Sequence, residues 1–171
     1  MRRLTIIGLL STQLFIACGT KKDVETEVIS VQESEIVMED DIEPPPPGFV
    51  SRFKSLEEWL VNICKERKPQ KAIAKYNLDL FEAADGYTLS LTGVNEYKLS
   101  QNETAVRIDF FPAEMYFDLP ESEYKSLNRQ EVIDRLTTKL KDFVNTEKFK
   151  KSFLSDADAI ATSWQGQIWS K

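Results

Sequence analysis

The chain has 171 residues, with 22 basic and 28 acidic side chains, no histidine and a net charge of −6. The lack of histidine excludes the common Ser-His and Cys-His catalytic arrangements and most zinc sites. No basic stripe with interleaved aromatic residues is present, which argues against nucleic-acid binding. The length allows one ordinary domain with flanking segments.

The first twenty residues have the pattern of an export signal. Arg2 and Arg3 precede an apolar run over residues 4–16, which ends in small residues around Cys18. A basic start, a short apolar run and a small-residue end are typical of a secretory signal peptide. The run is also shorter than the roughly 20 residues that span a bilayer.

The end of this segment, Phe15-Ile16-Ala17-Cys18, resembles the lipobox of bacterial lipoproteins. The resemblance implies that residues 1–17 are removed and that lipid on Cys18 anchors the mature chain to a membrane of the bacterial cell envelope. The residue after the cysteine is Gly19, and the absence of an aspartate at this position resembles outer-membrane rather than inner-membrane lipoproteins. The alternative is an uncleaved anchor in which Cys18 is an ordinary apolar residue.

Residues 18–48 are expected to form an acidic, proline-rich tether. After Cys18 the segment holds two lysines against nine acids, and it ends in Pro44–Pro47 and Gly48. Four consecutive prolines favour an extended polyproline II spacer, and the acidic part has too few large apolar residues to offset its ordering entropy. The alternative is that its valines and isoleucine form a short helix or strand against a partner: Val24, Val28, Val31, Ile36 and Val37.

Residues 49–171 are expected to form a single α+β domain, which is nearly neutral with 18 basic and 19 acidic groups. Ser55 and Glu58 have the spacing of a capping box, and apolar residues then recur on one helical face. This first helix is expected to end before Pro69, because the residue ahead of a proline is pushed out of helical geometry.

A strand-rich middle follows. Residues 76–81 and 87–92 alternate in polarity on either side of Asp85-Gly86, which predicts a hairpin. A third strand is expected over 104–111, and Pro112 should leave the continuation at 115–117 offset, bulged or at a sheet edge. These strands are expected to form an antiparallel meander.

The last third is predicted to be helical and then extended. Asn128 and Glu131 have capping-box spacing ahead of an apolar stripe, and a short second helix is expected after Thr146. The tail over 160–169 is β-prone, with Gly166 as a turn or bulge. If it pairs with the sheet, the helices pack on one sheet face.

The sequence assigns no catalytic residue, metal ligand or cofactor. Cys64 has no intramolecular disulfide partner if Cys18 carries lipid, and a buried, inert thiol is the favoured interpretation. Carboxylate pairs are the remaining acid–base candidates, and ordinary solvated acids are the alternative. The candidate pairs are Glu57 with Glu58, Asp109 with Asp118, Glu121 with Glu123, and Asp156 with Asp158.

Residues 110–121 are rich in aromatic side chains and methionine, which are enriched in the cores of protein interfaces. A central strand covered on both faces would have the same composition, so core residues are the alternative. The candidate partner-binding residues are Phe111, Met115, Tyr116, Phe117, Trp164 and Trp169. Two functions are compatible with the sequence: a tethered module that binds a protein partner, resembling immunity or envelope-machine lipoproteins, and a histidine-free hydrolase with a carboxylate pair.

Overall fold

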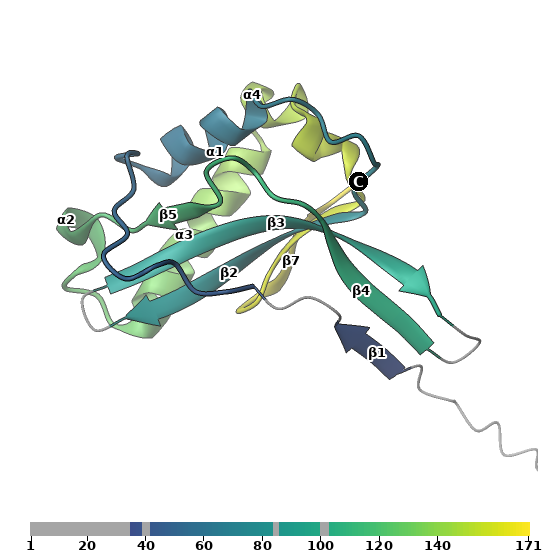
Figure 1. Ribbon diagram of the computed structural model, residues 1–171. Coiled ribbons are helices and arrows are strands. Elements are labelled where there is room, and N and C mark those ends of the chain that lie inside the picture. The colour runs from purple at the N-terminus through teal and green to yellow at the C-terminus, as the bar shows by residue number, and fades with distance from the viewer. Residues whose placement is uncertain (1–34, 39–41, 84–85, 100–102) are drawn as a thin grey trace, which may run out of the picture. The chain divides into compact units, whose positions relative to one another are not determined.

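The computed structural model describes residues 35–38, 42–83, 86–99 and 103–171 (Figure 1). The expected signal peptide, Cys18 and the first part of the tether lie outside these residues. Within them the α+β class is confirmed, because one mixed sheet packs against helices.

The sheet is larger than the expected meander with one added strand. The meander itself is confirmed, since β2 and β4 both pair antiparallel with β3. The full path runs β1-β4-β3-β2-β6-β7, and β5 also pairs with β3. The pairs β1–β4 and β2–β6 are parallel. The strands are β1 (Glu35–Met38), β2 (Lys75–Ala83), β3 (Gly86–Lys98), β4 (Glu103–Phe110), β5 (Tyr116–Asp118), β6 (Ala159–Thr162) and β7 (Gly166–Ser170).

The first predicted helix is α1 (Leu56–Cys64), which ends before Pro69 as expected. The Glu58 N–H donates to Ser55 Oγ at 3.2 Å, so Ser55 is the N-cap. The Glu58 carboxylate reaches back one residue further than a capping box requires and accepts from the Lys54 N–H at 2.9 Å. The bond to Ser55 satisfies a backbone donor that the first turn leaves without a helical partner, and the bond from Lys54 fixes the residue before the N-cap.

The β2–β3 hairpin is confirmed, with every residue of β2 paired to β3. Asp85 lies outside the described residues. Gly86 pairs with Ala83 and is the first residue of β3, so it is not a central residue of the turn as the sequence suggested. Strand β2 ends at Ala83 and β3 begins at Gly86.

Pro112 breaks the third strand as predicted. β4 ends at Phe110, and β5 resumes the pairing further along the same partner, opposite Thr88–Ser90 of β3. Residues 111–115, called the 111–115 loop, connect the two strands. β5 is thus an offset continuation of β4, because Pro112 has no N–H to donate to the ladder.

The C-terminal helices also follow the prediction. Asn128 and Glu131 form a complete capping box at the start of α3, and Thr146 caps α4. The tail is a hairpin rather than one strand, with Gly166 at φ +72° as the first residue of β7. The helical elements after β5 are α2 (Glu121–Tyr124), α3 (Arg129–Val144), α4 (Glu147–Lys150) and the 3₁₀ helix η1 (Phe153–Asp156).

The hydrophobic core lies between the helices and one face of the sheet. Alternate residues of β2 and β3 point into it, together with the apolar faces of α1 and α3. At its centre the Trp59 ring of α1 stacks on Phe117 of β5, with centroids 5.5 Å apart, and both side chains are fully buried. These two side chains tie the first helix to the offset strand β5.

The second face of the sheet, opposite the helices, is also partly covered. Residues 42–50, called the strap, run over it: the Tyr116 hydroxyl donates to the Glu43 carbonyl at 2.7 Å, and the Phe49 ring lies 5.7 Å from that of Tyr116. Tyr116 pairs directly with Ser90, and directly opposed residues share a face. Part of the expected tether, including β1, is therefore paired or packed against the sheet (Figure 1).

We predict that Gly93→Ala destabilises the domain by about 1–3 kcal/mol through overpacking. A Cβ at Gly93 would lie 2.9 Å from both Ile73 Cγ2 and Phe110 Cβ. Gly86→Ala is the matched control, because a Cβ there meets nothing within 4 Å. Urea denaturation of the two variants measures the difference, and equal unfolding free energies would contradict the close approach at Gly93.

Candidate functional site

The aromatic candidates from residues 110–121 occupy very different environments. Phe117 is fully buried in the core, and Tyr116 is partly buried between Phe49 and Phe81 on the second face. Met115 is partly buried, whereas Phe111 is 55 % exposed. Of this group, Phe111 offers the most apolar surface to a partner.

The 111–115 loop is held firmly despite lacking regular structure. The Trp59 indole N–H donates to the Glu114 carbonyl at 2.8 Å, and the Ala113 N–H donates to the Glu66 carboxylate at 3.1 Å. Arg52 forms an ion pair with the Glu114 carboxylate at 3.2 Å. Contacts with Trp59 in α1, with Arg52 before it and with Glu66 after it therefore fix the loop that displays Phe111.

The two tryptophans lie elsewhere, in the β6–β7 hairpin. Trp164 is in the turn, where its indole N–H donates to Thr137 Oγ1 of α3 at 3.3 Å. Trp169 of β7 contacts the Phe149 ring at 5.0 Å. Strand β2 lies between this hairpin and β3, the strand that pairs with β5. The structure thus does not join the tryptophans and the 111–115 loop into one surface.

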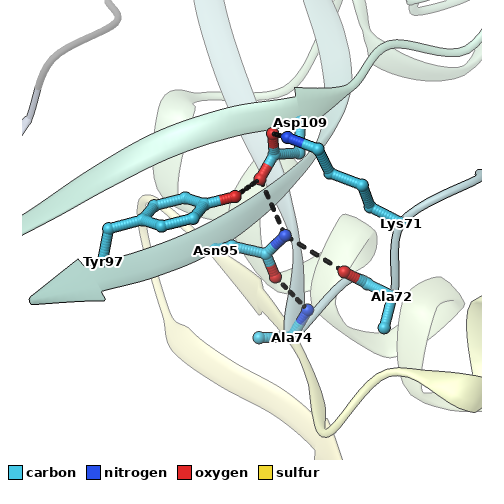
Figure 2. A network of polar contacts seen from close by, with 6 residues as sticks. All are labelled: Lys71, Ala72, Ala74, Asn95, Tyr97 and Asp109. Carbon is cyan, nitrogen blue, oxygen red and sulfur yellow. Dashed lines mark hydrogen bonds and ion pairs between the residues drawn. The ribbon is translucent and has the colours of Figure 1, made fainter.

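Asp109 is the most extensively bonded of the candidate acids (Figure 2). Its carboxylate accepts from the Lys71 ammonium at 2.7 Å, from Asn95 Nδ2 at 2.8 Å and from the Tyr97 hydroxyl. Asn95 in turn accepts from the Ala74 N–H at 2.7 Å. The network joins the connection between α1 and β2 to Asn95 and Tyr97 of β3 and to Asp109 of β4.

This network stabilises Asp109 as a carboxylate. Hydrogen bonds from Lys71, Tyr97 and Asn95 hold its pKa well below the usual range, and the same pair raises the pKa of Lys71. A carboxyl that stays ionised and accepts three bonds is a poor proton donor. Asp109 therefore acts as a structural anchor.

The other candidate acids also have ordinary surface partners. Glu57 pairs with Lys148 at 2.9 Å, Glu121 with Lys125 at 2.7 Å, and Asp156 with Lys68 at 2.7 Å. Lys125 lowers the pKa of Glu121, and Lys68 lowers that of Asp156. Asp118 accepts a bond from the Thr88 hydroxyl at 2.8 Å. The lowered pKa values of Glu121 and Asp156 are the opposite of the raised pKa that a general acid requires.

A carboxyl that the sequence did not single out, Asp79, lies in a hollow on the second face. The second-face cavity has a volume of about 310 Å³. Burial raises the pKa of Asp79, while hydrogen bonds from Ser163 and Asn77 act in the opposite direction. Alternation in β2 indicated only that Asp79 faces away from Leu78 and Leu80; nothing in the sequence indicated that this face would be hollowed. The cavity is lined by Ile42, Asn77, Asp79, Leu80, Phe81, Thr92, Val94, Val106, Ile108 and Ser163.

Cys64 is partly buried at the end of α1 and has no disulfide partner among the described residues. Burial raises the pKa of its thiol, and a hydrogen bond with Ser152 lowers it to a smaller extent. A raised pKa disfavours the thiolate, which is the reactive form. In the described ranges, no group of three potential metal-ligating side chains forms, and no helix is long and apolar enough to cross a membrane.

No family model, no curated protein and no solved structure matches this chain. The candidate surfaces therefore rest on the geometry described above.

We predict that Asp109→Asn lowers the unfolding free energy by about 1–3 kcal/mol at pH 7, because the amide cannot accept from all three donors. The folded pKa of Asp109 lies below the unfolded value of about 4, so its stabilisation is present above that pH. The difference between wild type and variant should shrink as the pH falls below about 4. Denaturant unfolding from pH 7 to pH 2 measures it, and a difference independent of pH would contradict the role of the charge.

Proposed function

We propose that this protein is a lipid-anchored module of the bacterial cell envelope that binds a protein partner. Lipid on Cys18 would hold it at the membrane, and the outer membrane is the favoured location. The domain would bind its partner through the 111–115 loop, with Phe111 at the centre of the contact.

The observation that carries this proposal is the exposure of Phe111 on an anchored loop. A large aromatic side chain that is 55 % exposed gains substantially from burial against a partner. The hydrogen bond from Trp59 to the loop and the one from the loop to Glu66 already order it, so binding would cost little additional conformational entropy. Interface hot spots are commonly aromatic residues of this kind.

Charge supports a protein partner over a nucleic acid. Residues 49–171 carry 18 basic and 19 acidic groups, and many described lysines pair with acids, as in the Lys71–Asp109 and Lys139–Glu123 contacts. Nucleic-acid binding needs a field of unpaired basic groups, whereas a nearly neutral surface with an exposed aromatic suits a protein.

We predict that Cys18→Ser releases the protein from the membrane without unfolding the domain. Acyl chains on Cys18 would supply about 0.8 kcal/mol per buried methylene, and the substitution removes them all. Fractionation of cells that express each form measures the distribution. If the variant stayed in the membrane fraction with the wild type, the lipid anchor would be wrong.

We predict that Phe111→Ser abolishes capture of a protein partner at native expression. The tagged full chain is purified from its own cells in detergent, and co-purifying proteins are identified by mass spectrometry. Leu99→Ser is the matched control, because Leu99 is similarly exposed at 51 % but lies outside the loop. Wild type and the Leu99 variant should retain one stoichiometric partner that the Phe111 variant loses. Equal capture by all three, or no partner with any, would contradict the proposal.

A further inference from the structure

The second-face cavity has a polar half that is incompletely satisfied. Thr92 is fully buried and lines the cavity, yet its hydroxyl oxygen has no hydrogen-bond partner among the described residues. Buried polar atoms normally have partners, and an unpartnered hydroxyl costs about 1–3 kcal/mol. A ligand that bonded to Thr92 would remove this cost.

Asp79 gives the polar half a negative charge. Both oxygens of its carboxylate accept from Asn77 Nδ2, at 3.2 and 3.0 Å, and these bonds add no compensating charge. The lining residues include no lysine or arginine. A partly buried carboxylate without a cation is electrostatically complementary to a positively charged ligand and repels an anion.

The sheet register places Asp79 and Thr92 at a distance that one small cationic group can bridge. Asp79 pairs directly with Ser90, and Asn77 pairs directly with Thr92, so Asp79 and Thr92 are diagonal neighbours on the same face. Diagonal neighbours on a sheet lie about 7–8 Å apart at the backbone. One ammonium group with hydrogen bonds of about 2.8 Å on each side fits between two such side chains.

The other half of the cavity is aliphatic. Val94 of β3 pairs with Ile108 of β4. Val106 lies two residues before Ile108 in the same strand, so it is on the same face. All three side chains line the cavity. This wall suits a short branched or linear hydrocarbon, and the volume of about 310 Å³ is at the lower end of the range for small-molecule sites.

We infer that the second-face cavity binds a small aliphatic amine in its protonated form. The ammonium group bonds to Asp79 and Thr92, and the hydrocarbon packs on Val94, Val106 and Ile108. The site does not involve Phe111 or the 111–115 loop, so it is independent of the proposed protein partner.

The test is a titration of the ¹⁵N-labelled full chain in detergent with 3-methylbutylamine, followed by amide NMR shifts. The isosteric controls are 3-methylbutan-1-ol, which is uncharged, and 3-methylbutanoate, which is an anion. We expect saturable shifts around Asn77, Asp79 and Thr92 with the amine, weaker binding of the alcohol and none of the acid.

Two variants separate the cavity from binding elsewhere. Asp79→Asn should weaken binding of the amine at least tenfold, because it removes the negative charge. Thr92→Val keeps the shape of the side chain and should weaken binding of the amine about three- to tenfold. The unfolding free energy of the domain should be equal or higher, because the lost hydroxyl had no partner. Thr92→Val also decides the question if Asp79→Asn fails to fold.

Three results would overturn the inference. The first is the absence of saturable shifts with the amine up to about 50 mM, which is a weak limit for a site of this size. The second is equal binding of 3-methylbutanoate at the same amides. The third is amine affinity equal to wild type in the folded variants.

Discussion

The pairing of β3 with three other strands is the constraint on which the rest of the structure depends. All three strands are antiparallel to β3. β2 pairs along one edge, and β4 and β5 pair at different positions along the other. Side chains on both faces of β3 are buried: Leu89 and Leu91 on the core face, and Ser90 and Thr92 on the second face. The break between β4 and β5 follows from Pro112 and produces the loop that displays Phe111.

The elements that sequence reasoning predicted well are those fixed by local rules. The caps at Ser55, Asn128 and Thr146 each depend on a few adjacent residues, and each helix begins where its cap indicates. The interruption at Pro112 also follows from local chemistry, since proline lacks an N–H. Local rules could not give the parallel pairing of β6 with β2 or of β1 with β4, because those contacts join distant parts of the chain.

The candidate sites were harder to predict for a related reason. Alternation indicated that Thr88, Ser90 and Thr92 face away from the core, which normally means solvent; the structure instead buries all three. The aromatic composition of residues 110–121 could not separate Phe117, which is core, from Phe111, which is exposed. Whether each of these side chains is buried depends on which distant segments pack over it, and the local composition does not contain that information.

We propose that the 111–115 loop presents Phe111 to a protein partner, and photo-crosslinking in living cells tests this contact. A photoreactive phenylalanine analogue would replace Phe111 in the full chain, and the same analogue at Leu99 would serve as the reference position. We expect one discrete crosslinked protein species from position 111 that is absent from position 99. The same pattern of products from both positions, or no crosslinked protein from position 111, would contradict it.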